Sequence, residues 1–192
     1  MKTTHLAAAL VLALSAMPAA AQDQETAMEA YLELSQPGKM HEVLHKVIGD
    51  WTYTARVWAV PGAPVSESKG TMSAEALLGG RFVKEEWDGE MMGLPFSGIG
   101  INGFDVERGK FSSHWMDNLS TIVTEFEGEC VDASCSGIEM TSSVTDPSSG
   151  RSEVLMRMRS SWEGDDRFTT VSYMTTPDGG EFKNMEIVAV RK

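Results

Sequence analysis

Ten short segments in which apolar and polar residues alternate constrain the fold of this chain most strongly. Such alternation places successive side chains on opposite faces of a β-strand. The turns between them, such as Leu78-Gly79-Gly80 and Pro177-Asp178-Gly179-Gly180, supply the positive-φ and Asx-type positions that reverse a chain. We expect strands at Trp51–Val60, Ser68–Leu77, Arg81–Glu90, Phe96–Phe104, Lys110–Asp117, Thr121–Glu129, Ser136–Thr145, Ser152–Trp162, Arg167–Thr176 and Glu181–Arg191.

The connections between these strands determine how they pair. None is long enough to hold a crossover helix, so consecutive strands are expected to pair antiparallel. Closing such a sheet on itself removes its exposed edges. We therefore predict an all-β fold, an up-and-down antiparallel barrel of about ten strands, with a two-sheet sandwich as the alternative.

Two helical segments precede the strands. Gln24–Leu34 is expected to form a short helix that ends before Pro37-Gly38. Within Met40–Ile48 the apolar residues recur at i, i+3, i+4, i+7 and i+8, which predicts an amphipathic helix. Gly49 is well placed to end it.

The N-terminus has the pattern of a secretory signal peptide. Lys2 precedes an apolar run at Leu6–Ala16, and Ala19-Ala20-Ala21-Gln22 offers a small-x-small cleavage site. The run is too short for a stable membrane span, so a retained anchor is the weaker interpretation. No cysteine lies at the junction, so a lipid anchor is not indicated. We predict a signal peptide at 1–21, an N-terminal extension at 22–39, a barrel domain at 40–192, and a periplasmic or secreted location.

The charge of the chain excludes some partners. Removing residues 1–21 takes away Lys2 and no acidic side chain, so the net charge goes from -12 to -13. Nucleic-acid binding requires clustered Lys and Arg, which are scattered singly here. An anionic membrane surface is disfavoured for the same reason. The oligomeric state is left open.

The two cysteines lie five positions apart between strand-like segments. In an oxidising compartment, Cys130 and Cys135 are expected to form a disulfide across a hairpin. Half of a zinc site is the alternative, but no further His or Cys lies nearby to complete it.

Several motifs together resemble one bacterial family. They are His45-Lys46, Gly49-Asp50-Trp51, Gly79-Gly80-Arg81-Phe82, Gly89–Phe96, Gly98-Ile99-Gly100, Ser113–Asp117 and Phe182–Glu186. From about residue 40 to its end, the chain resembles the domain-of-unknown-function family number 1579, which is regarded as a calycin-like barrel. Gly49-Asp50-Trp51 is similar to the Gly-x-Trp opening of lipocalins and calycins. That resemblance implies that Trp51 closes the barrel floor and that Arg191 packs over it; it implies no activity.

One tempting motif is His41-Glu42-Val43-Leu44-His45, which fits the H-E-x-x-H pattern of zinc proteases. His41 and His45 are one helical turn apart and could bind a metal. However, no third ligand follows at a protease-like spacing. We favour an ordinary helix at the end of the barrel, with the two histidines as weak metal candidates.

Methionines and acidic residues on the strands suggest what a barrel interior would contain. Eleven of the 13 methionines follow residue 21, but they lack the Met-x-x-Met spacing of copper carriers. They suit adaptable packing or an apolar cavity. Glu85 with Trp87, and Trp115 with Asp117, share a face of their strands. If that face is interior, the carboxyl groups orient a ligand; if it is exterior, Glu86 and His114 point inward.

These residues favour a binding barrel over an enzyme. The chain has no Gly-x-Ser-x-Gly elbow, phosphate loop or plausible Cys-His pair. We therefore expect a cavity for a small hydrophobic or amphipathic molecule, with no cofactor. An enzyme acting inside the barrel is the alternative. Less favoured alternatives are a structural role in the cell envelope, metal binding, and haem binding through His114. The candidate ligand-binding residues are Glu85, Trp87, Met91, Trp115, Asp117, Met156, Met158, Tyr173 and Met185.

Overall fold

The computed structural model describes residues 19–145 and 150–192. The described part contains helices α1 (Ala19–Leu34) and α2 (Lys39–His45), followed by ten strands. The strands are β1 (Gly49–Val57), β2 (Ser66–Leu77), β3 (Phe82–Met91), β4 (Leu94–Asp105), β5 (Lys110–Asp117), β6 (Thr124–Cys130), β7 (Gly137–Val144), β8 (Val154–Trp162), β9 (Arg167–Thr175) and β10 (Glu181–Arg191). Most of the predicted signal peptide, and residues 146–149 of a predicted turn, lie outside the described residues.

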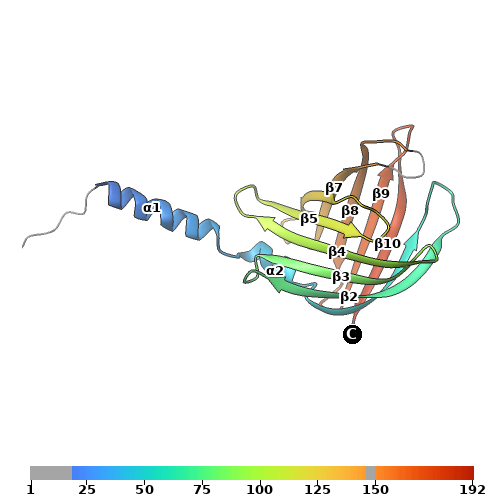
Figure 1. Cartoon of the computed structure of the whole chain (residues 1–192), viewed down its shortest axis with the longest axis horizontal. Helices are drawn as coiled ribbons and strands as arrows, with labels where there is room; N and C mark the ends of the chain where they lie inside the picture. The colour runs from blue at the N-terminus through green and yellow to red at the C-terminus, as the bar shows by residue number, and fades with distance from the viewer. Residues whose placement is uncertain (1–18, 146–149) are drawn as a thin grey trace, which may run out of the picture. The chain divides into compact units, whose positions relative to one another are not determined.

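The strands form one closed antiparallel barrel (Figure 1). Each strand pairs with the next along the chain, and β10 returns to pair with β1. The predicted barrel is therefore confirmed, and the two-sheet sandwich is wrong. Strand ends differ from the prediction chiefly where β1 stops at Val57 and where β6 begins only at Thr124, because the intervening residues belong to loops at one end of the barrel.

The chain divides into two compact units, residues 1–35 and 36–192. The first contains α1, and the second contains α2 and the barrel. Within the described residues, no helix has both the length and the apolar character needed to cross a membrane.

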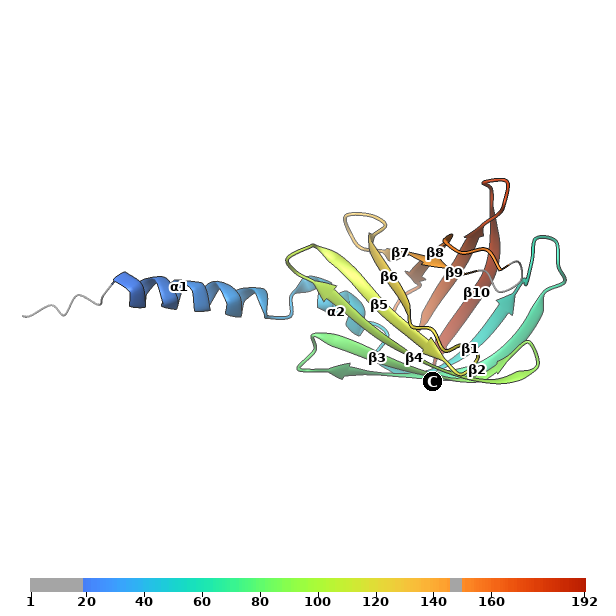
Figure 2. The same ribbon diagram turned by 45° about the horizontal axis from the view of Figure 1, so that its top comes forward.

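The two ends of the barrel differ. Because strand direction alternates, the β2–β3, β4–β5, β6–β7 and β8–β9 loops lie at the end where β1 begins, which is also the end that α2 covers. The loops from β1 to β2 and from β9 to β10 extend at the opposite end (Figure 2). We call the first end the floor and the second the mouth.

The floor is the densest part of the core. Trp51, Val83 and Phe111 are fully buried there, and the Trp51 ring meets Phe168 edge-on at 5.0 Å between centroids. Val43 and Leu44 bring the apolar side of α2 onto this layer. Burying these large side chains against the ends of the strands closes the barrel at α2.

The segment from α2 into β1 is held by two side chains. The Trp51 indole N–H donates to the Val47 carbonyl at 2.8 Å. The Arg191 guanidinium donates to the carbonyls of Lys46 and Ile48 at 2.9 and 2.7 Å. These donors satisfy carbonyls that have no partner within the helix. α2 ends at His45 rather than at the predicted Ile48, and Lys46, Val47 and Ile48 continue it only as i→i+3 turns.

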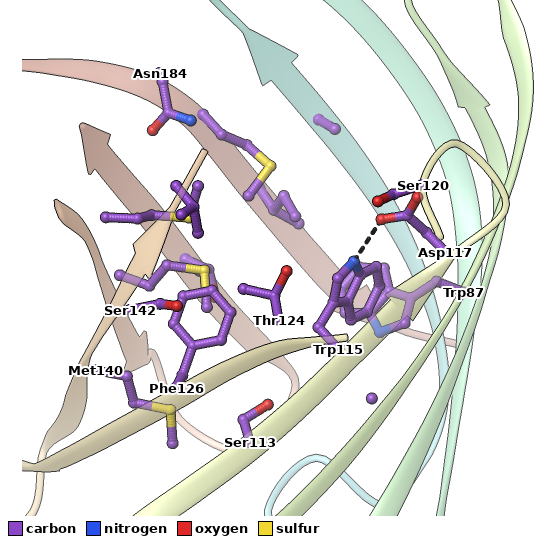
Figure 3. A pocket seen from close by; sticks show the side chains of 18 of the residues that line it. Trp87, Ser113, Trp115, Asp117, Ser120, Thr124, Phe126, Met140, Ser142 and Asn184 are labelled. Atoms are coloured by element: carbon purple, nitrogen blue, oxygen red, sulfur yellow. Dashed lines mark hydrogen bonds between the residues drawn. The ribbon is translucent and has the colours of Figure 1, made fainter. Parts of the chain in front are cut away.

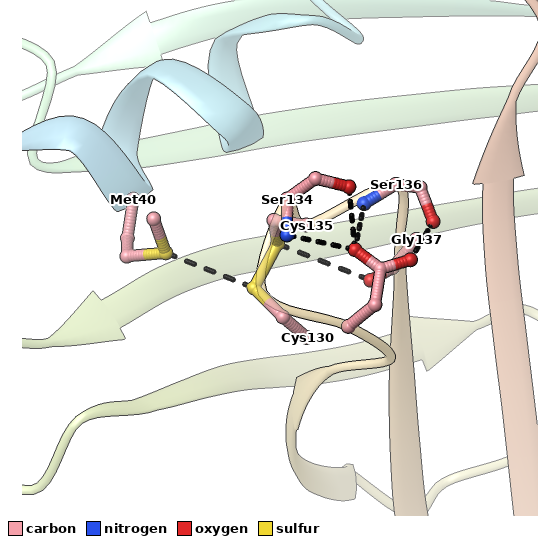
Figure 4. The surroundings of a disulfide bond; sticks show 7 residues. Met40, Cys130, Ser134, Cys135, Ser136 and Gly137 are labelled. Carbon is pink, nitrogen blue, oxygen red and sulfur yellow. Dashed lines mark hydrogen bonds between the residues drawn. A yellow bond between two sulfur atoms is a disulfide. The ribbon is translucent and has the colours of Figure 1, made fainter.

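The predicted disulfide between Cys130 and Cys135 is confirmed. It closes the β6–β7 loop at the floor, and the Cys130 sulfur lies 3.7 Å from the Met40 sulfur of α2 (Figure 4). Inside the loop, the Asp132 carboxylate accepts hydrogen bonds from the backbone N–H groups of Ser134 and Ser136. Hydrogen bonds from the Ser134 and Ser136 hydroxyls lower the pKa of Asp132 most, and the backbone bonds act in the same direction.

Candidate functional site

The barrel encloses a cavity of about 1330 Å³ that opens at the mouth. Pockets for drug-sized ligands commonly measure about 300–1,000 Å³, so this space accommodates a large organic molecule. Leu44 and Val47 lie at its floor end, and the β5–β6 loop lies at its mouth. The cavity therefore runs most of the length of the barrel.

One wall of the cavity is aromatic and comes from β1, β3, β4 and β5. Tyr53 and Trp87 lie 5.0 Å apart, and Trp87 meets Trp115 edge-on at 6.3 Å between ring centroids. Phe96 stacks on Trp115 with an interplanar angle of 18°. Aromatic pairs in such geometries hold one another's orientation. The result is a continuous aromatic wall in which most neighbouring rings meet at steep angles.

Two glycines on β4 give the aromatic wall its shape. A Cβ added at Gly98 would lie 2.5 Å from Cζ2 of Trp115, so the indole lies directly over the glycine backbone. A Cβ at Gly100 would lie 3.6 Å from both the Trp115 ring and a Glu85 oxygen. Without side chains at these positions, the rings lie back against the sheet.

The facing wall is rich in methionine and comes from β7 to β10. Met156 lies opposite Met174 in the β8–β9 pair, and Met158 lies opposite Met140 in the β7–β8 pair. Met185 of β10 completes the set. Figure 3 shows Met140, Phe126 and Ser142 across the cavity from the two tryptophans. Flexible, polarizable thioethers allow this wall to adjust to a guest.

Glu85 is the acidic side chain deepest in the cavity. One carboxylate oxygen accepts from the Trp87 indole N–H at 3.0 Å, and the other accepts from the Asn102 amide at 3.0 Å. Burial raises the pKa of Glu85, although the bonds from Trp87 and Asn102 act in the opposite direction. The cavity thus contains one partnered carboxyl group in an otherwise largely apolar interior.

A second indole–carboxylate pair lies nearer the mouth. The Trp115 indole N–H donates to Asp117 at 2.8 Å, as the dashed line in Figure 3 shows, and Asp117 also accepts the Leu119 backbone N–H. In the loop that follows, Leu119, Ile122 and Val123 are exposed and border the cavity. This loop presents an apolar rim to a ligand entering the barrel.

The structure decides which strand faces point inward. Of the predicted ligand-binding residues, the following line the cavity: Glu85, Trp87, Met91, Trp115, Asp117, Met156, Met158 and Met185. Glu86 and His114 lie on the outer surface, where Glu86 pairs with Lys84 at 2.7 Å and His114 lies 3.7 Å from Glu125. Because His114 points outward, β5 offers no inward histidine that could serve as an axial haem ligand.

Tyr173 is placed differently from our expectation. It is absent from the cavity lining, and the Arg157 guanidinium covers its ring on the outer surface at 4.6 Å. Its neighbour Met174 lines the cavity instead, because the inward series of β9 runs through Phe168 and Thr170. Tyr173 is thus removed from the candidate site.

The two histidines of the H-E-x-x-H motif stabilise helix α2 and its packing against the barrel. His41 is buried, accepts the Gly38 N–H at 3.0 Å through Nδ1, and meets Phe104 edge-on. Burial lowers the pKa of His41, which favours the neutral ring that this bond requires. His45 bonds the Gly80 carbonyl at 2.9 Å. Among the described residues, no group of three or more His, Cys, Asp or Glu is arranged to hold a metal ion.

Several cavity residues were missed at the level of sequence. They are Tyr53, Phe96, Asn102, Ser113, Met140 and Met174. Asn102 is the most informative, because it supports Glu85 from the adjacent strand. Its signal was present, since Asn102 and Gly100 share a face of β4 and Gly100 lies opposite Glu85.

Comparison with known proteins agrees with this architecture. The model of the family described as "Protein of unknown function (DUF1579)" matches residues 36–191. The chain is a member of the DUF1579 family. A search of curated proteins gave no significant match.

Among solved structures, this DUF1579 member resembles Rv2717c from M. tuberculosis, with a TM-score of 0.58 and 16% identity over 82% of this chain and 99% of that one. It also resembles the S-type phycobiliprotein lyase CPES from Guillardia theta, with a TM-score of 0.54 and 10% identity over 80% of this chain and 92% of that one. At these identities, the likeness shows a shared barrel fold.

Proposed function

We propose that this DUF1579 barrel binds a small apolar or amphipathic molecule inside its cavity. The observation that carries the proposal is the cavity of about 1330 Å³ between an aromatic wall and a methionine wall. A barrel of this strand number does not need an empty interior for stability, and a cavity of this size forgoes packing contacts. A ligand that fills it regains those contacts.

A fluorescent probe tests this proposal directly. N-phenyl-1-naphthylamine is neutral and apolar, and its emission rises when it leaves water. Titrated into the protein, it should show saturable one-site binding and quench Trp87 and Trp115. Linear, non-saturating uptake would contradict the proposal. Native mass spectrometry of protein purified from its own source would then show which molecule it carries.

We further propose that the protein acts outside the cytoplasm, after cleavage behind Ala21. The N-terminal pattern and the Cys130–Cys135 disulfide support this placement. The intact mass of the chain recovered from an export-competent host tests it. A chain that begins at Gln22 is the expected product, and a full-length chain retained inside the cell would contradict the proposal.

An enzymatic role is favoured by one observation, the buried Glu85 carboxyl with its raised pKa. Such a group is suited to proton transfer to a bound molecule. One structural neighbour is a lyase, so the fold is compatible with catalysis. Incubating the identified ligand with the protein and with Glu85→Gln, followed by mass analysis, separates the roles: only an enzyme converts the ligand, and only when Glu85 is present.

A further inference from the structure

The charged residues that line the cavity are all acidic. Glu85 lies deep inside, and Asp117 lies nearer the mouth. Glu90, Glu125 and Glu153 border the mouth, and of these Glu125 lies on the outer face, 3.7 Å from His114. None of the described lining residues is Lys, Arg or His. The interior therefore has a single sign of charge, which is unusual for a cavity that would receive an anionic ligand.

Basic side chains of other strands, β1 and β8, lie on the outer surface. Arg56 bonds Glu67 at 3.0 Å, and Arg157 bonds Glu139 and Glu181 at 3.1 and 2.8 Å. These pairs keep the cations outside, where water screens them. An anionic head group inside the barrel would meet carboxylates and no counter-charge from the described lining.

Glu85 offers a docking point for a positive charge. The bonds from Trp87 and Asn102 take one acceptor position on each of its oxygens, and a carboxylate has about four such positions. Gly100 presents no side chain beside the carboxyl, and a Cβ there would lie 3.6 Å from a Glu85 oxygen. An ammonium group at this point would form a charge-assisted hydrogen bond in a site shielded from bulk water.

The neighbouring aromatic rings add to this preference. Trp87 lies on the same strand as Glu85, and Trp115 lies opposite Gly100 in the β4–β5 pair; both line the cavity. The face of an indole carries negative electrostatic potential and attracts a cation within about 6 Å of its centroid. The net charge of -12 also draws cations toward the mouth.

We propose that the ligand of this barrel is a cationic amphiphile, bound with its amine at Glu85 and its apolar tail between the aromatic and methionine walls. This inference rests on the proposed binding function and specifies the ligand class. It predicts discrimination by head group alone, because the tail contacts are the same for any alkyl chain.

Three ligands with one tail test the proposal. Decylamine, decanol and decanoate are each titrated, below their micellar concentrations and at pH 7, against protein loaded with N-phenyl-1-naphthylamine. Decylamine should displace the probe at concentrations at least about tenfold lower than decanoate, equivalent to about 1.4 kcal/mol. Decanol should fall between them. This ranking uses the unaltered protein and needs no variant to fold.

A matched pair of variants then assigns the preference to Glu85. Glu85→Gln keeps the size and a hydrogen-bonding oxygen but removes the charge, so decylamine should lose about tenfold in affinity while decanol is unchanged. Glu86→Gln, on the outer face of the same strand, should leave all three affinities unchanged.

The outcomes distinguish this proposal from the one on which it rests. If decanoate binds as well as decylamine, or if Glu85→Gln and Glu86→Gln behave alike, the ligand class is wrong although the barrel still binds amphiphiles. If neither the probe nor any of the three decyl compounds binds, the proposed binding function fails and the ligand class fails with it.

Discussion

Arg191 lies directly opposite Trp51 in the β1–β10 pair, and its guanidinium carbon is 4.1 Å from the centroid of the indole. The same guanidinium donates to three backbone carbonyls, those of Lys46, Ile48 and Asp165. The last strand, the first strand and the segment from α2 are thereby joined at one point. Arg191 thus makes more contacts at the floor than an exposed ion pair such as Arg167–Glu163 does.

Replacing this arginine should destabilise the barrel measurably. Arg191→Met keeps the aliphatic stem but removes the cation and its three hydrogen bonds, so we expect unfolding free energy to fall by about 2 kcal/mol. Arg167→Met removes an exposed ion pair with Glu163 and should cost less than about 1 kcal/mol. Urea denaturation of both variants makes the comparison, and equal losses would contradict the role assigned to Arg191.

Removing the disulfide should lower the unfolding free energy by about as much as Arg191→Met does. The loop between Cys130 and Cys135 is short, so loss of the bond should lower unfolding free energy by about 2 kcal/mol in the loop-entropy description. Denaturation of a Cys130→Ser, Cys135→Ser double variant measures the loss. A reductant should weaken the unaltered protein and leave the double variant unchanged; if both respond equally, the bond is not responsible.

The pH dependence of stability should reveal the ionisation of the Glu85 carboxyl. Its pKa is raised in the folded barrel, mainly by burial, so ionisation is easier in the unfolded chain. The contribution of Glu85 to stability is therefore complete below the ordinary glutamate pKa and is lost as pH rises through the raised value. The difference in unfolding free energy between the unaltered protein and Glu85→Gln should therefore shift against the unaltered protein as pH rises above about 4.5. Glu86→Gln should follow the unaltered protein; a flat difference would contradict the assignment.

The same substitution at two adjacent residues of β9 should affect ligand binding at only one of them. Met174→Trp places a larger ring in the cavity, whereas Tyr173→Trp changes only the outer surface beneath Arg157. We expect Met174→Trp to weaken binding of N-phenyl-1-naphthylamine by about tenfold, or about 1.4 kcal/mol, and Tyr173→Trp to leave it unchanged. Thermal unfolding of both variants verifies that each is folded. The reverse order would mean that the inward face of β9 is misassigned.

The number of strands and their pairing were predictable from local chemistry. Gly-rich turns mark where the chain reverses, and short connections permit only antiparallel neighbours. The loops at the mouth were harder, because Thr121–Val123 has strand-like composition but no pairing partner in the barrel. Tertiary pairing, not propensity, decides such residues.

The inward face of each strand was only partly predictable. On β3, Lys84, Glu86 and Asp88 share one face, and three charges in series indicate the outer surface. That signal would have placed Glu85 and Trp87 inside. On β9, Tyr173 and Met174 are equally apolar, and the guanidinium that covers Tyr173 comes from another strand. The local pattern offers only one charge, Arg167, on the same face as Tyr173, which is a weaker signal than the three charges on β3.

The bare backbone at Gly98 has a consequence for how this family can diversify. Because Trp115 rests on that glycine, a single methyl group there would tilt the indole toward the methionines and narrow the chamber without altering any strand pairing. Relatives with alanine at this position should hold slimmer cargo on an unchanged frame. The volume of the cavity can thus change while the barrel architecture stays the same, because Gly98 affects the position of Trp115 and not the strand pairing.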